Sequence, residues 1–182
     1  MKKILLVLTL ILTLGSNTMA YEEANYETIS ENGNYEIRKY FDRLVIETDS
    51  TEGNGFRKLF NYISGNNEDK KEIKMTVPVT QENKDGNMKM QFYLPSKFNK
   101  ENVPKPLNPE IKVLNIEGGY YAVIKYSGRS SDKNFIKNKD ILEKELKKDD
   151  IIILSPPIRA SYNSPFTLPI LKRNEVMFRI DL

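Results

Sequence analysis

Alternating apolar and polar positions along the chain predict a series of β-strands. We expect strands at residues 26–29, 35–40, 44–48, 73–81, 88–94, 111–114, 120–126, 151–154, 158–162 and 175–180. Asn32 and Gly33 form a pair that accepts the positive φ of a tight hairpin turn, and Gly118 and Gly119 mark another turn. Because Pro78 has no N–H to donate, the segment that contains it should lie at a sheet edge or carry a bulge.

Two further segments have helical spacing. In the first, an apolar stripe recurs at i, i+3, i+4 and i+7 and consists of Phe56, Leu59, Phe60 and Ile63. The second begins at Ser131 or Asp132, either of which can cap a helix, and ends near Lys147. Its inner side carries Phe135, Leu142 and Leu146. This order of elements predicts an α+β fold, a distorted antiparallel β-barrel of two similar halves with two flanking helices.

The first twenty residues have the pattern of a signal peptide. Lys2 and Lys3 precede an apolar run over residues 4–14, and a small, polar stretch then leads to Ala20. The alternative is an uncleaved membrane anchor, but the run is short for a hydrocarbon core of about 30 Å, which needs roughly 20 residues. We expect cleavage after Ala20, export to a periplasm or the medium, and one mature domain over residues 21–182 without stable membrane insertion.

Composition excludes several classes of function. The chain has 28 Lys plus Arg against 25 Asp plus Glu, with the two signs interspersed, so it lacks the basic face of a nucleic-acid-binding protein. It contains no cysteine, and therefore no disulfide and no lipoprotein attachment cysteine. It contains no histidine, which removes the commonest metal ligand and every Ser-His or Cys-His nucleophile arrangement. We expect a monomer that binds no nucleic acid.

Several blocks of sequence occur together in a characteristic order. They are residues 35–40, 60–67, 73–79, 92–95, 126–128 and 162–165 with 173–176. The Met-Thr-Val-Pro-Val block at 75–79 and the Arg-Asn-Glu-Val block at 173–176 are the specific ones. The chain resembles the SOUL haem-binding proteins in these blocks, over essentially the whole mature chain. The resemblance implies a barrel of two pseudo-repeated halves and a haem or tetrapyrrole ligand. It also implies a similarity in fold to bacterial effector-binding domains that take up amphiphilic small molecules.

The resemblance places haem against the first helix and the loop before the last strand. The apolar candidates for contact are Phe56, Leu59, Phe60, Ile63, Met75, Tyr162 and Phe166, and the loop at 165–171 should cover the ligand. Arg57, Lys172 and Arg173 are candidate partners for the haem propionates. The alternative for the helix stripe is ordinary core, and the alternative for the charges is an exposed, solubilising role.

Without histidine or cysteine, haem iron has only Tyr62, Tyr162, Met75 or a similar group as a ligand. We expect haem or a similar flat amphiphile to bind in a hydrophobic groove without histidine ligation, catalytic residues or a protein-bound metal ion. One alternative is an amphiphile binder or a hydrolase related to effector-binding domains, with Glu175 as the acid or base; the default role of Glu175 is pairing with Arg173 or Arg38. Another is a protein-interaction module, favoured if the barrel fills its own groove.

The export hypothesis is tested by the mature N-terminus. Intact-mass measurement of protein from the native host should give a chain that begins at Tyr21. A full-length species in the cytoplasm would contradict it.

Overall fold

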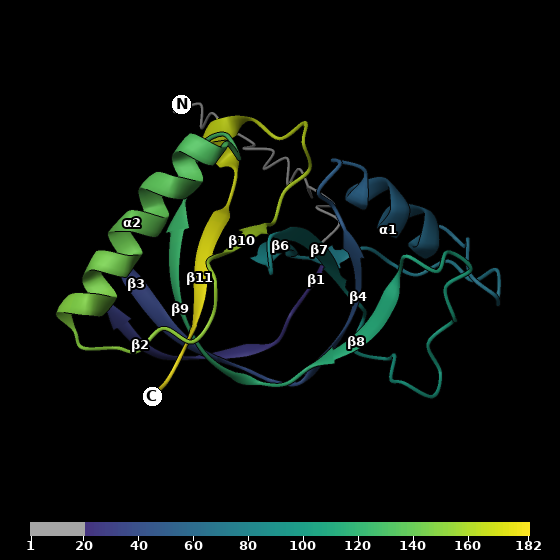
Figure 1. Ribbon diagram of the computed structural model, residues 1–182, viewed down its shortest axis with the longest axis horizontal. Coiled ribbons are helices and arrows are strands. Elements are labelled where there is room, and N and C mark those ends of the chain that lie inside the picture. The colour runs from purple at the N-terminus through teal and green to yellow at the C-terminus, as the bar shows by residue number, and fades with distance from the viewer. Residues whose placement is uncertain (1–20) are drawn as a thin grey trace, which may run out of the picture.

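A computed structural model describes residues 21–182 of the chain (Figure 1). The expected signal peptide at residues 1–20 lies outside the described residues. Within residues 21–182, none of the helices combines the length and the apolar character that crossing a membrane requires.

A single curled sheet of nine strands dominates the structure. Its strands lie in the order β2 (Tyr26–Asn32), β3 (Tyr35–Tyr40), β9 (Gly119–Tyr126), β11 (Asn174–Ile180), β10 (Ile158–Ser161), β6 (Val79–Lys84), β7 (Asn87–Tyr93), β4 (Arg43–Asp49) and β8 (Lys112–Ile116). Every pairing in this sheet is antiparallel. The sheet forms an open half-barrel (Figure 1), which confirms the expected α+β class and distorted barrel.

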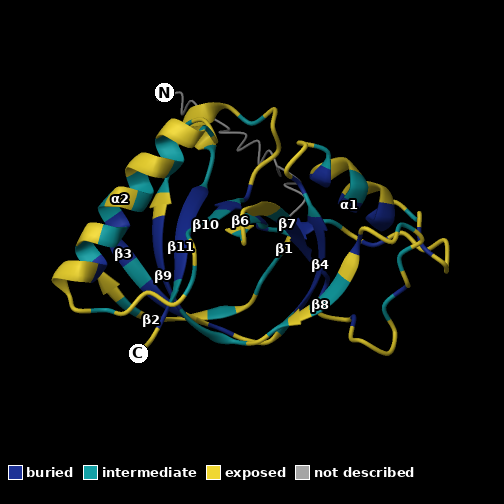
Figure 2. Ribbon diagram, in the orientation of Figure 1, coloured by how far each residue is buried: buried dark blue, intermediate teal, exposed yellow. Residues whose placement is uncertain are grey.

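Two helices cover the same face of the sheet, one on each half. Helix α2 (Asp132–Lys148) lies over β9 and β11, and α1 (Gly55–Ile63) lies over β4 and β7. Ser131 caps α2 as expected, because its side chain accepts a hydrogen bond from the backbone N–H of Asn134. The buried strands lie beneath helices whose outer sides are exposed (Figure 2). We call this side of the sheet the helix face, and the opposite side the inner face.

Alternation along the strands builds a separate core on each face. Under α2 lie side chains such as Ile124 and Phe178, and under α1 lie side chains such as Ile46 and Phe92. The inner face carries a third cluster that consists of Tyr40, Tyr121, Val123, Ala160, Tyr162 and Met177. The two faces therefore differ in chemistry, since tyrosines make up much of the inner cluster.

Two short strands lie outside the main sheet. β1 (Glu22–Glu23) and β5 (Thr76–Val77) pair in parallel. The extended segment expected at residues 73–81 is thus divided at Pro78 into β5 and β6, which agrees with the missing N–H donor of proline.

The prediction of a strand at residues 151–154 was wrong. Within this segment only Ile153 forms an isolated bridge, which it makes with Ile180, and Ile152 is largely exposed. The physical reason is that β9 pairs with one edge of β11 along its whole length, and β10 pairs with the other edge as far as Met177. The segment at 151–154 can therefore reach only the end of β11.

The apolar stripe of α1 is divided between the core and the surface. Leu59 and Ile63 are buried against β4 and β7, which agrees with the alternative that the stripe is ordinary core. Phe56 and Phe60, by contrast, are 43% and 47% exposed. Because the contact between α1 and the twisted sheet is narrow, the side chains at the edge of the stripe, Phe56 and Phe60, stay partly exposed to solvent.

Substitution on α1 tests this division. Leu59→Ala should lower the free energy of unfolding by about 3 kcal/mol, because it leaves a cavity in a closed core. Phe60→Ala, the matched control one position along, should change it by less than about 1 kcal/mol. Urea unfolding measures both, and equal losses would show that Phe60 is also core.

Candidate functional site

A groove on the helix face runs between α1 and the loop that joins β10 to β11. It consists of two adjoining cavities with volumes of about 200 Å³ and 290 Å³. The two cavities share the lining residues Phe56, Val79, Ser161, Asn163 and Pro165. Because α1 and the loop belong to different halves of the chain, the groove exists only in the folded protein.

One end of the groove is apolar. Phe60, Met75, Val77 and the ring of Tyr162 line it, together with Tyr21. The rings of Phe56 and Phe60 are stacked, with their centroids 5.9 Å apart and their planes 13° apart. They form an exposed, flat aromatic surface on α1, which is the shape that a planar apolar ligand contacts well.

The other end is polar. Ser130, Ser161, Asn163, Lys172 and Asn174 line it. Ser130 Oγ donates to Asn174 Oδ1 at 2.5 Å, and Lys172 Nζ donates to the Pro165 carbonyl at 3.0 Å. An ammonium group has three N–H donors, so Lys172 has further donors for a ligand. The groove is therefore amphipathic along its length.

The structure brings together part of the expected site. Phe56, Phe60, Met75, Tyr162 and Lys172 line the groove. The other expected residues lie elsewhere: Leu59 and Ile63 in the core, Arg57 on the surface, Phe166 on the outside of the loop and Arg173 in an ion-pair network. Within the loop at 165–171, Pro165 lines the groove, whereas Phe166 is 96% exposed and lies outside the groove lining.

Apart from Lys172, sequence reasoning missed the polar end of the groove. Ser130, Ser161 and Asn174 come from three separate segments and meet only through the order of the strands. The available signal was their position in or next to the characteristic blocks: Asn174 belongs to the Arg-Asn-Glu-Val block, Ser130 lies two positions after the Tyr-Ser-Gly block, and Ser161 precedes the block at 162–165.

Behind the groove wall lies a buried network centred on Glu175. Arg38 donates to both carboxylate oxygens of Glu175, at 3.0 Å and 3.1 Å. The hydroxyl of Tyr162 donates to Oε2 at 2.7 Å, and Arg173 Nε donates to Oε1 at 2.9 Å. Arg173 also forms a two-bond ion pair with Glu23. The expected structural pairing of Glu175 is confirmed, with both Arg38 and Arg173.

This network sets the electrostatics of the groove wall. Burial alone would lower the pKa of Arg38, but hydrogen bonds and charge attraction from Glu175 outweigh it and raise that pKa. Burial, and then the charge of Glu175, raise the pKa of Tyr162 well above its usual value. Tyr162 is therefore a neutral phenol near neutral pH, with its hydroxyl already committed to Glu175.

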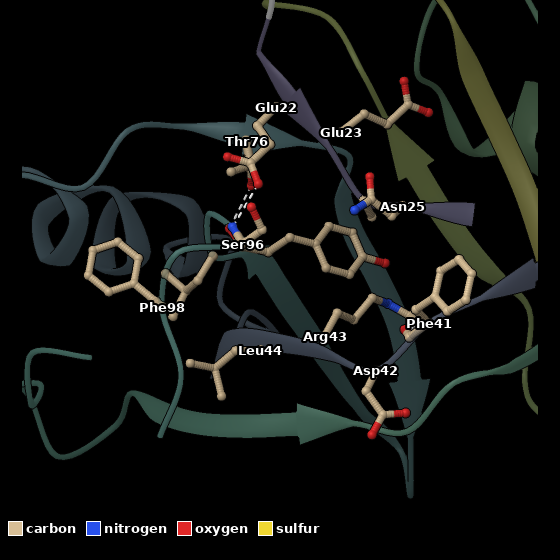
Figure 3. Close-up of a pocket in the computed structure, with 13 residues that line it drawn as sticks. Glu22, Glu23, Asn25, Phe41, Asp42, Arg43, Leu44, Thr76, Ser96 and Phe98 are labelled. Atoms are coloured by element: carbon tan, nitrogen blue, oxygen red, sulfur yellow. Dashed lines mark hydrogen bonds between the residues drawn. The ribbon is translucent and has the colours of Figure 1, made fainter. Parts of the chain in front are cut away.

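A further cavity of about 190 Å³ lies beside the β1–β5 pair, with Glu22, Glu23 and Thr76 in its lining (Figure 3). Arg43 enters this cavity, and its guanidinium carbon lies 5.0, 5.4 and 5.3 Å from the ring centroids of Tyr40, Tyr93 and Tyr121. Its Nη2 donates to the Tyr121 hydroxyl at 3.2 Å. These distances correspond to cation–π contacts.

Arg43 and Tyr93 also line a cavity of about 340 Å³ on the inner face, so they lie between the two spaces. That cavity has a charged lining, which includes Glu82, Lys84 and Arg179. Lys84 pairs with Glu82 at 2.7 Å. The interior of the half-barrel therefore offers charges and phenols, and it suits a flat apolar ligand less well than the groove does. Among the described residues, no group of three or more acidic side chains is placed to hold a metal ion.

Removing the acid at the centre of the network tests its structural role. Glu175→Gln should lower the free energy of unfolding by about 3 kcal/mol, because it removes the buried carboxylate that binds Arg38 and leaves the partly exposed Glu36 as the acid paired with that guanidinium. Glu23→Gln, which removes a half-exposed partner of Arg173, should lower it by less than about 1 kcal/mol. Denaturant unfolding distinguishes the two, and a near-neutral Glu175→Gln would contradict the role given to the pair.

Comparison with known proteins gives the following similarities. The profile of the SOUL heme-binding protein family matches residues 21–179. Heme-binding protein 2 of Homo sapiens is 30% identical over 163 residues, which cover 81% of this chain and 78% of that protein. In fold, the chain is similar to the EcmrR C-terminal domain, with a TM-score of 0.58, 12% identity and coverage of 86% and 98% of the two chains. It is also similar to a hydrolase from Listeria innocua, with a TM-score of 0.59, 8% identity and coverage of 84% and 94%.

Proposed function

Because the chain belongs to the SOUL haem-binding protein family, we propose that it binds haem or another tetrapyrrole in the groove between α1 and the β10–β11 loop. The observation that carries this proposal is the amphipathic groove, with stacked aromatic rings at one end and Lys172 with small polar side chains at the other. Haem has the same division, since its ring is flat and apolar and its two propionates share one edge.

The division of the groove gives the ligand one orientation. The porphyrin face lies against Phe56 and Phe60, with Met75 and the ring of Tyr162 around it. The propionates reach the polar end, where Lys172 supplies a positive charge and N–H donors. Arg173 is unsuited to this role because Glu23 and Glu175 already occupy its guanidinium.

Haem is bound here without a strong axial ligand. The chain has no histidine or cysteine, and the hydroxyl of Tyr162 donates to Glu175. Affinity then comes from burial of the porphyrin and from a few propionate contacts, offset by the entropy lost on association. We expect a Kd of about micromolar or weaker, equivalent to roughly −8 kcal/mol.

Binding is proposed to occur without turnover, in a monomer that is exported. Glu175 is the best placed acid for hydrolysis, but Arg38, Arg173 and Tyr162 already bind both of its carboxylate oxygens. The likeness to the Listeria innocua hydrolase is one of fold. The second candidate function is binding of a different flat amphiphile, which the same groove geometry favours.

Titration with haemin, followed by its Soret band, tests the site. Phe60→Asp should weaken binding at least about tenfold, because it places a charge on the apolar surface. The matched control is Ile136→Asp, an exposed apolar position on α2, which should leave the Kd unchanged. Circular dichroism checks that both variants fold. Protoporphyrin without iron should bind the parent nearly as tightly as haemin does.

Three outcomes contradict the proposal. Absence of saturable haemin binding by the parent would exclude haem as the ligand. A folded Phe60→Asp variant with the parental Kd would place the site elsewhere. Hydrolysis of activated esters that is lost in a folded Glu175→Gln variant would show turnover at the buried acid.

A further inference from the structure

The loop between β10 and β11 exposes an unusual amount of apolar surface. Phe166, Leu168, Ile170 and Leu171 are between 64% and 96% exposed within a few positions of one another. Figure 2 shows this stretch largely in the colour of exposed residues. Single exposed apolar side chains are ordinary, but such a cluster indicates an interaction surface. We call residues 165–171 the apolar loop.

The apolar loop is held in a defined shape. Pro165 and Pro169 restrict its backbone, and residues Pro169–Leu171 form a short 3₁₀ helix, η1. The Thr167 N–H donates to the Ser164 carbonyl at 3.1 Å, and the Gly128 N–H donates to the Pro169 carbonyl at 2.9 Å. Its apolar side chains therefore stay exposed without collapsing onto the protein.

Basic side chains surround the base of the loop. The bond from Gly128 to Pro169 brings the loop beside Arg129 and Lys133, at the start of α2, and Lys172 follows directly after η1. Among the described residues none of these three cations forms an ion pair. The nearby acid Asp132 is neutralised by Arg159 at 2.6 Å. The loop thus combines projecting apolar side chains with uncompensated positive charge.

We infer that the apolar loop docks the protein on the surface of a bilayer that contains anionic lipids. Phe166 and Ile170 enter the interface, and Arg129 and Lys133 contact the lipid headgroups. A lipid surface fits better than a folded partner, because the apolar side chains project from a convex loop and the charges around it share one sign.

The position of the groove gives this docking a consequence. Asn163 and Pro165 belong to the start of the loop and also line the groove. Docking would bring the groove to the membrane surface, where amphiphilic ligands concentrate. The docking itself is independent of the proposed ligand, and it is measured without haem.

The absence of tryptophan from the chain gives a direct test. Phe166→Trp puts a single reporter on the loop, and Ile152→Trp puts one on an exposed apolar position near the C-terminal end of β11. With vesicles of phosphatidylglycerol and phosphatidylcholine, only the loop reporter should shift its emission to shorter wavelength and be quenched by brominated lipid. Parent and variants are expressed from the full sequence and checked by intact mass, so that they share one N-terminus.

Vesicle sedimentation then separates the apolar and electrostatic contributions. Phe166→Asp with Ile170→Asp should weaken binding at least about tenfold, because each buried apolar side chain contributes on the order of tenfold. The matched control, Ile152→Asp with Leu154→Asp, should leave binding unchanged. The double variant Arg129→Gln with Lys133→Gln should weaken binding to anionic vesicles. Its matched control is Lys137→Gln with Lys144→Gln, which changes two exposed lysines farther along α2 and should have little effect.

Two results would overturn the inference. One is equal vesicle binding by the parent and by the Phe166→Asp with Ile170→Asp variant. The other is an emission spectrum of Phe166→Trp that does not change when anionic vesicles are added. If sedimentation equilibrium then detects a dimer, the loop is an interface between two copies of the chain and not a membrane contact. Because no haem is present in these assays, either result leaves the haemin titration to stand or fall by itself.

Discussion

The ion pair between Arg38 and Glu175 is the buried contact on which one wall of the groove depends. Neither side chain has measurable exposure, and the pair joins β3 to β11 across the intervening β9. Burying two charges is favourable only when their geometry is good and their remaining hydrogen-bond sites are filled. The Tyr162 hydroxyl and the guanidinium of Arg173 meet that condition at Glu175, and the carboxylate of Glu36 does so at Arg38.

The same pair connects the interior of the barrel to the groove. Tyr162 follows β10, its hydroxyl is fixed by Glu175, and its ring forms part of the groove wall. Arg173 links Glu175 to Glu23 of β1, the strand that pairs with β5 behind the apolar end of the groove. A network with no direct ligand contact thus positions the surface that we propose binds the ligand. The network also makes the inner face polar, so the groove on the helix face suits a flat apolar ligand better.

The sequence was sufficient to predict what depends on local periodicity. Alternation gave most of the strands, helical spacing gave both helices, and Ser131 was recognised as a cap. Periodicity could not divide the α1 stripe, because Leu59 and Phe60 both satisfy the spacing and only the angle of α1 on the sheet separates them. It also could not show that β9 and β10, paired with the two edges of β11, exclude residues 151–154 from the sheet.

Most features that depend on the meeting of distant segments were beyond prediction, although the pairing of Glu175 with Arg38 was one of the two expected alternatives. Arg43 lies among tyrosines from β3, β7 and β9, which come together only through the register of the whole sheet. The family resemblance indicated α1 and the β10–β11 loop, and the geometry of these two elements decided which of their residues line the groove. Lys172 remained available at the groove, whereas Arg173 was drawn into the buried network.

The location of the ligand can be measured most directly with methionine methyl groups. Met75 lines the apolar end of the groove, and Met177 lines the cavity on the inner face. A porphyrin ring current shifts the NMR signals of nearby methyl groups. On titration with iron-free protoporphyrin, the account predicts an upfield shift of the Met75 methyl signal and little change at Met177. A shift of Met177 with an unchanged Met75 would place the ligand inside the half-barrel and contradict the account.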